Sequence, residues 1–306
     1  MKRLLLLLLI AAIPVLRAEE KQALLIVAGE PGNALYQDEF QRQVKVWQEL
    51  AAKAKMDVSI IGAADAPPEG DRPSLEKTIG NLPKSGGDLW MVWIGHGTFD
   101  GRSAKFNLRG PDIEASELAE LLKPFQRRLI VLNLFSASGP FVAPLAGKDR
   151  VIVSASRGGE RNYSRLGEKL ANSLGSTDAD LDLDGSLSLL EAVLHASAAA
   201  KAFYDDAQRV VSEHAIIDDN GDGRGTGTDK FKGLRAEGTS PDGVLAREIH
   251  FFSDSPDPLS PEARDERAKL EAEIEALRLR KKEFREDDYY AKLEPLMRRM
   301  AKLYGK

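Results

Sequence analysis

Two apolar runs of the sequence end in residues that could do chemistry. The run LWMVWIG, residues 89–95, is followed by His96 and Gly97, and the run LIVLNLF, residues 129–135, is followed by Ser136. Runs of this kind are typical of buried strands, and a parallel sheet presents its ligand-binding residues at the carboxyl ends of its strands. A histidine and a hydroxyl brought to one edge predict a general base beside a nucleophile.

The order and spacing of these two strand ends resemble the caspase–hemoglobinase clan of cysteine peptidases, in particular legumain-type (asparaginyl endopeptidase) proteins and their bacterial relatives. The resemblance spans about residues 22–252 and rests on His96-Gly97 and on Ser138-Gly139. It implies that His96 is the general base and that Ser136 holds the position of the family's nucleophilic cysteine. It also implies that the main-chain N–H groups of Gly97 and Ser136 stabilise an oxyanion.

The same region departs from that family at several positions. The chain contains no cysteine, so Ser136 stands where the nucleophilic thiol is expected. The acidic residue two places earlier in legumains is Leu134 here, and the pair that grips an asparagine side chain aligns near Gln37–Asp38. A serine hydroxyl is far less acidic than a thiol and needs a base oriented by a carboxylate. Asp100 is the nearest candidate for that carboxylate in the sequence.

The segment DLDLDGSLSLLE, residues 180–191, matches the calcium loop of an EF-hand. Oxygen donors fall at the ligand positions, and a glycine stands where the chain must turn sharply. The expected ligands are Asp180, Asp182, Asp184, Ser186, Ser188 and Glu191. We therefore predict calcium as the cofactor. The alternative is a polar turn in which Ser188 and Glu191 form a capping box for the next helix, and the two interpretations can coexist.

A second acidic loop, DDNGDGRGTGTD at residues 218–229, fits the same pattern less well. Its glycine at position 8 is not apolar, and no helical pattern follows it. A turn-rich loop and a second metal loop therefore both remain open. The possible ligands are Asp218, Asn220, Asp222 and, for the twelfth position, Asp229.

The elements that must position these residues alternate between strand-like and helix-like patterns. Near-continuous Val, Ile and Leu runs separated by amphipathic segments predict an α/β protein with a mainly parallel sheet covered by helices on both faces, as in caspase/legumain-like folds. A late apolar run at 244–252 could extend the sheet. The expected strands are 23–29, 56–62, 89–95, 129–135 and 149–156, and the expected helices include 36–54 and 114–125.

The ends of the chain differ in composition from its middle. Residues 1–18 have a basic start, an apolar run and a small residue at Ala18, which predicts a signal peptide and an exported protein, periplasmic or extracellular. The apolar run is too short for a stable membrane span. Residues 19–255 are expected to form the caspase/legumain-like domain. Residues 262–306 predict a charged helical tail, a hairpin broken near Asp287.

Composition also limits the partners. The formal net charge is −5, and no basic patch is interleaved with aromatic residues, so nucleic acid is not an expected ligand. The sequence as a whole predicts an exported calcium-binding pseudopeptidase that binds peptides or partner proteins. The alternatives are an active peptidase with a Ser136/His96 dyad and a calcium-stabilised structural module. The oligomeric state is left open by the sequence.

Overall fold

The computed structural model describes residues 21–304, except 64, 66, 161–162, 237–241 and 253–260. The expected signal peptide at 1–18 lies outside the described residues. Within them, every helix is too short or too polar to cross a bilayer.

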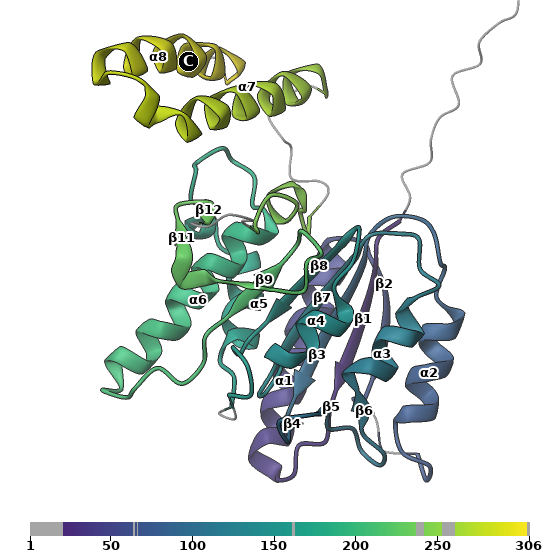
Figure 1. The fold of residues 1–306 in the computed structure, drawn as a ribbon. Coiled ribbons are helices and arrows are strands. Elements are labelled where there is room, and N and C mark those ends of the chain that lie inside the picture. The colour runs from purple at the N-terminus through teal and green to yellow at the C-terminus, as the bar shows by residue number, and fades with distance from the viewer. Residues whose placement is uncertain are drawn as a thin grey trace, which may run out of the picture.

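A seven-stranded sheet lies at the centre of the described chain (Figure 1). Five parallel strands form most of it, and two short antiparallel strands complete one edge. This arrangement confirms the predicted mainly parallel sheet. In spatial order the strands are β10 (Thr226–Gly227), β9 (Ile216–Asp218), β8 (Arg150–Ser154), β7 (Leu129–Phe135), β3 (Leu89–Gly95), β1 (Ala23–Ala28) and β2 (Asp57–Ile61).

The two central strands carry the residues that could do chemistry. Every residue of β3 and β7 is buried, as expected of strands covered on both faces. Their parallel register pairs Gly95 with Phe135, so the two strands end at the same level. His96 and Ser136, each one residue further along, therefore reach the same edge of the sheet.

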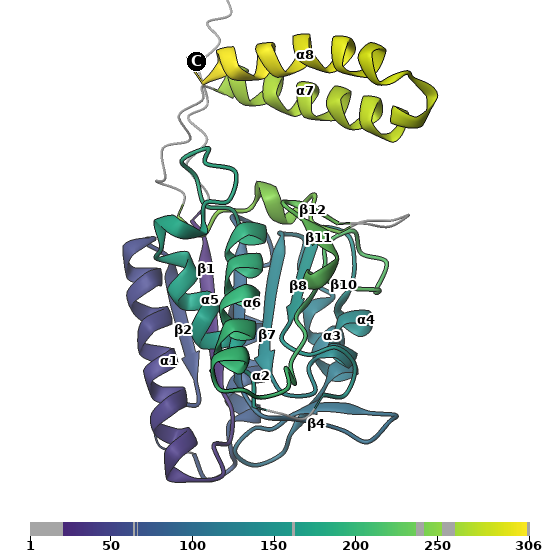
Figure 2. The same ribbon diagram turned by 90° about the vertical axis from the view of Figure 1, so that its left-hand side faces the viewer.

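Helices cover both faces of the sheet. Figure 2 shows α1 (Ala34–Lys53), α5 (Leu166–Leu174) and α6 (Leu189–Asp206) on the face toward the viewer. The opposite face is covered by α2 (Arg72–Asn81), α3 (Ala115–Leu122) and α4 (Val142–Leu145). Two apolar clusters separated by the sheet form the core, as the predicted layers require.

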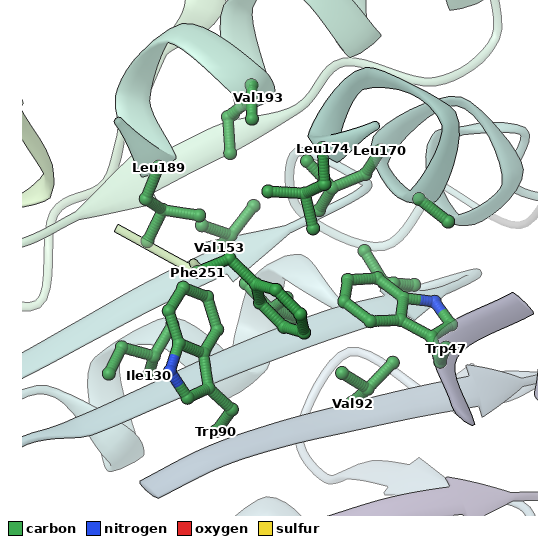
Figure 3. Packing of buried hydrophobic residues seen from close by; sticks show 14 of the residues in the cluster. Trp47, Trp90, Val92, Ile130, Val153, Leu170, Leu174, Leu189, Val193 and Phe251 are labelled. Carbon is green, nitrogen blue, oxygen red and sulfur yellow. The ribbon is translucent and has the colours of Figure 1, made fainter. Parts of the chain in front are cut away.

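The late apolar run at 244–252 does not form the expected strand. Ala246–Glu248 is a single 3-10 turn, η4, and His250 makes only an isolated bridge to Ser188. The apolar residues of this run serve packing instead. The ring of Phe251 lies 5.0 Å from Trp90 and 5.8 Å from Trp47, between the sheet and its covering helices (Figure 3). The edge position itself is taken by β9 and β10.

A three-stranded sheet follows β3 directly. Its strands are β4 (Gly97–Phe99), β5 (Ala104–Phe106) and β6 (Ile113–Glu114). The N–H of Asn107 donates to the carbonyl of His96 at 3.0 Å, so this sheet fixes the main chain at the strand end. A short pair, β11 (Phe231–Lys232) and β12 (Arg235–Ala236), lies later in the chain.

The C-terminal segment forms two helices that pack on each other, α7 (Pro261–Leu279) and α8 (Glu286–Leu303). The break falls at residues 280–285, slightly before the predicted Asp287. Asp287 lies in the first turn of α8, where a negative charge interacts favourably with the helix dipole. Leu270 and Ile274 of α7 are buried, and so is Tyr289 of α8.

Candidate functional site

His96 lies at the end of β3 in an aromatic setting. Its ring centre is 4.6 Å from that of Tyr36, 5.3 Å from that of Phe40 and 6.2 Å from that of Tyr163. Burial among these rings lowers the pKa of His96, partly opposed by a hydrogen bond to the main chain of Pro31. The neutral imidazole is therefore favoured, which is the protonation state that a general base needs.

Ser136 is buried, and its hydroxyl is engaged with the main chain of β4. The N–H of Gly97 donates to Ser136 Oγ at 3.3 Å, and Oγ in turn donates to the carbonyl of Gly97 at 3.4 Å. Among the described residues, Ser136 makes no hydrogen bond to His96. The structure thus brings the two strand ends to one edge without forming the nucleophile–base contact that activation of a serine requires.

The turn after Ser136 is tightly held. Ala137 has a φ of +57°, a left-handed conformation that is uncommon for alanine, and its N–H donates to the carbonyl of Glu160 at 2.6 Å. The hydroxyl of Ser156 accepts from the N–H of Ser138 at 2.8 Å. A side chain at position 97 would lie 2.5 Å from the carbonyl of Ser136, so only glycine permits this approach. The backbone of a nucleophile turn is present, although its hydroxyl is turned inward.

No carboxylate of the described chain orients His96. Asp100, the expected candidate, is exposed and accepts from the N–H groups of Arg102 and Ser103 at 2.8 Å each, which caps its own turn. His214 has a carboxylate partner, since its Nδ1 lies 2.6 Å from Glu160 Oε1. No local pattern could have predicted that pair, because the two residues are far apart along the chain.

A pocket of about 450 Å³ lies beside the aromatic neighbours of His96. Arg165 is positioned in it by stacking, with its guanidinium 5.1 Å from the ring of Tyr163 and 4.7 Å from that of Phe203. The pocket therefore combines aromatic faces with fixed positive charge. Its lining includes Tyr36, Glu39, Tyr163, Arg165, Phe203 and Arg209.

The first acidic loop brings three of its expected ligands together. Carboxylate oxygens of Asp180, Asp182 and Asp184 all lie within 4.8 Å of one another. Burial, together with the charges of Asp184 and Glu191, raises the pKa of Asp182 to about 6. The cluster therefore carries a repulsion between like charges that a divalent cation would relieve.

Glu191 lies outside this group of three, and its carboxylate holds the loop together through hydrogen bonds. It is buried, and its Oε1 accepts from the N–H groups of Leu181 and Asp182 at 2.9 and 3.3 Å. Its Oε2 accepts from the N–H and the hydroxyl of Ser188, the capping box that the sequence suggested. Ser186 donates its N–H to Asp184 Oδ1 at 2.8 Å. In this state both oxygens of Glu191 bind the protein itself.

The C-terminal helices reach this loop through one arginine. Arg267 Nη1 of α7 lies 2.9 Å from Asp184 Oδ2 and 3.1 Å from the hydroxyl of Tyr304. A positive charge therefore already faces one of the three aspartates. This contact joins distant segments of the chain and has no local pattern that could have predicted it.

The second acidic loop keeps three of its four expected residues in one turn. Asp218 is fully buried, whereas Asn220 and Asp222 are exposed. Asp229 instead faces two cations, at 3.7 Å from Arg157 and 3.6 Å from Lys230.

Comparisons with known proteins give similarity to solved structures alone: no family model and no curated protein matches the chain. The Drosophila initiator caspase Dronc matches with a TM-score of 0.45 and 12% identity over 68% of this chain and 84% of that chain. Caspase-1 from Spodoptera frugiperda gives 0.43 and 10% over 66% and 87%. A Geobacter sulfurreducens protein gives 0.43 and 13% over 65% and 92%. Similarity at this level assigns neither an activity nor a partner to the chain.

Proposed function

We propose that this chain is an exported calcium-binding protein of the legumain and caspase type, that it has lost peptidase chemistry, and that it binds peptides or protein partners. The observation that carries the proposal is the hydrogen bonding of Ser136. Its hydroxyl is buried and exchanges hydrogen bonds with Gly97 rather than with His96. Among the described residues, His96, the candidate base at the strand edge, therefore makes no hydrogen bond to a nucleophile.

The electrostatics of the edge support the same conclusion. A serine nucleophile needs a base whose developing positive charge is stabilised by a carboxylate. His96 is surrounded by Tyr36, Phe40 and Tyr163, and Asp100 is committed to its own turn. Protonation of His96 in this apolar setting is costly, so proton transfer from a serine is opposed.

The aromatic pocket beside His96 supports the binding role. Its stacked Arg165 and the rings of Tyr163 and Phe203 suit an acidic or aromatic side chain of a peptide, because a guanidinium pairs with carboxylates and an aromatic face contacts apolar groups. A pocket of about 450 Å³ is within the range of side-chain and small-ligand sites.

The calcium role rests on the cluster of Asp180, Asp182 and Asp184. Three carboxylates within 4.8 Å offer a set of hard oxygen donors, which calcium prefers. Bound calcium would supply the positive charge that offsets their repulsion. It would thereby stabilise the loop that precedes α6, a helix buried against the sheet.

The loss of peptidase chemistry is tested with a fluorophosphonate probe, which reacts with activated serines. We expect wild type to be labelled no more than the Ser136→Ala variant, with an active serine hydrolase as the positive control. Labelling that disappears on Ser136→Ala would contradict the proposal and favour the active hydrolase. Binding is tested separately with a library of acidic and aromatic peptides. Arg165→Ala should retain fewer of these peptides than wild type. Equal retention by the two proteins would exclude this pocket as the peptide-binding site.

A further inference from the structure

The second acidic loop holds its main chain in the same way as the first. In both loops the side chains at positions 3 and 5 accept from the N–H two residues later, at distances between 2.8 and 3.2 Å; the pairs are Asp182–Asp184, Asp184–Ser186, Asn220–Asp222 and Asp222–Arg224. Positions 4 and 6 have positive φ in both, at Leu183, Gly185, Gly221 and Gly223. The match predicted from sequence for the first half of the loop therefore extends to its backbone.

The carboxylate that closes the second loop is Asp242. Its Oδ1 accepts from the N–H groups of Asp219 and Asn220 at 3.1 and 3.3 Å, which are positions 2 and 3. Glu191 Oε1 accepts from the same two positions of the first loop. Asp242 thus occupies the place that the linear pattern assigned to Asp229.

A separate observation concerns Asp218, the first residue of the loop. Its carboxylate is fully buried, and its Oδ1 accepts from the N–H of Gly221 at 3.0 Å. Its Oδ2 is buried with no hydrogen-bond partner. A buried carboxylate oxygen without a partner is costly, and such an atom indicates a missing ligand or proton.

The charges around Asp218 favour a cation as that ligand. The carboxylates of Asp218, Asp219 and Asp242 are all buried. In the described part of the chain, neither these three carboxylates nor that of Asp222 forms an ion pair. Several negative groups thus lie close together, and among the described residues no ion pair offsets them.

We propose that the loop at 218–222, closed by Asp242, is a second divalent-cation site that takes calcium, with Asp218 Oδ2 as a ligand. Asn220 and Asp222 supply further oxygens from the same turn. All of these donors are oxygens, which favours calcium over metals that prefer nitrogen or sulfur. The inference goes beyond the proposed function, which requires only the first loop.

Calcium titration of the full chain by calorimetry tests this site, with two exposed aspartates as a matched pair. Asp222→Asn keeps the acceptor for Arg224 N–H but removes a ligand charge, whereas Asp229→Asn changes a residue outside the site. We expect two calcium ions per chain in wild type and in Asp229→Asn. Asp222→Asn should weaken one of the two sites by about tenfold or more, because the charge of the ligands sets affinity.

The first loop is weakened independently with Asp182→Asn, after which one calcium ion should still bind with the wild-type affinity. One ion in wild type whose affinity only Asp182→Asn lowers would overturn the second site while leaving the proposed function intact. One ion whose affinity only Asp222→Asn lowers would sustain the second site and contradict the first. If Asp218 Oδ2 merely carries a proton, Asp222→Asn and Asp229→Asn will give the same titration as wild type, and the inference fails.

Discussion

The strand edge and the first acidic loop both gather residues capable of chemistry, but they treat those residues differently. At the edge, Ser136 is satisfied by hydrogen bonds to the main chain, and His96 packs among aromatic rings. In the loop, three aspartates are held within 4.8 Å of one another, and Arg267 faces one of them. One site has its polar groups paired, and the other leaves negative charge to be neutralised.

The difference shows why residue types at the right spacing do not by themselves establish a function. A histidine and a hydroxyl at one sheet edge suggest catalysis, yet hydrogen bonds decide whether a proton can pass between them. Carboxylates held close together repel one another, and a bound cation would relieve that repulsion.

The largest effect is expected from Glu191→Ala. This change removes the acceptor for the N–H groups of Leu181, Asp182 and Ser188 and for the Ser188 hydroxyl. Loss of a buried acceptor and of a helix cap should lower the free energy of unfolding by about 2–4 kcal/mol without calcium. Urea unfolding in chelator measures it, with the exposed Asp178→Ala as the matched control. Equal midpoints for the two variants would show that the loop is not closed through Glu191.

The metal-free protein should also respond to pH through Asp218. Its pKa is raised from 3.8 to about 6 in the folded state, so between these values the folded chain binds more protons than the unfolded chain. The contribution of this group to the free energy of unfolding is therefore fully present near pH 4 and is lost as the pH rises to about 6. The loss is at most about 3 kcal/mol. Unfolding of wild type and Asp218→Asn between pH 4 and 7, in chelator, isolates the effect. A wild-type slope no steeper than that of the variant would contradict it.

The buried state of Ser136 is tested by a single introduced thiol, since the chain has no cysteine. Ser136→Cys should react with iodoacetamide at least about tenfold more slowly than Ser85→Cys, an exposed control, because burial disfavours the thiolate. A faster reaction at position 136 would mean that His96 activates this position. The strand edge would then be a working catalytic site.

The smallest effect is expected from Arg267→Gln. The guanidinium lies 2.9 Å from Asp184 Oδ2 and competes with any cation bound there. Its removal should tighten calcium binding by only a few-fold, because one partly exposed ion pair contributes little free energy. Arg299→Gln is the control, because its partners Glu266 and Glu273 lie within the helical pair. A weaker affinity in Arg267→Gln would exclude competition.

Much of the fold was predictable from local patterns. Runs such as those of β3 and β7 are long and almost entirely apolar, so they indicated buried parallel strands directly. The three-residue strand β9 is too short to give a recognisable strand pattern in the sequence. The prediction of a strand at 244–252 was wrong, because apolar residues of this run fill the core around Phe251 instead of pairing with an edge strand of the sheet.

The site was predictable only where its residues are neighbours in sequence. Asp180, Asp182 and Asp184 follow a local pattern, and the structure gathers them. Asp242 reaches its loop from another segment, and the Arg267 contact joins residues 83 positions apart, so neither has a local signature. The inward turn of the Ser136 hydroxyl depends on Gly97 of a different strand.

The hydrogen bonds of Glu191 also determine which variant reports calcium binding most clearly. Glu191→Gln would set an amide NH₂ against several N–H donors, and would lower stability even without metal. The Oδ1 of Asp182 accepts from the N–H of Asp184, and partial desolvation of the carboxylate, together with the charges of Asp184 and Glu191, raises its pKa. Asp182→Asn therefore removes repulsion and the charge of a calcium ligand at the same time.

The most direct test of calcium binding is the melting midpoint of wild type and Asp182→Asn, each in chelator and in excess calcium. Wild type should gain about 5 °C or more at a hundredfold excess over Kd, and Asp182→Asn should gain clearly less. In chelator, Asp182→Asn should melt at or above wild type, because a like charge has been removed. A wild-type midpoint that does not move with calcium would contradict the account.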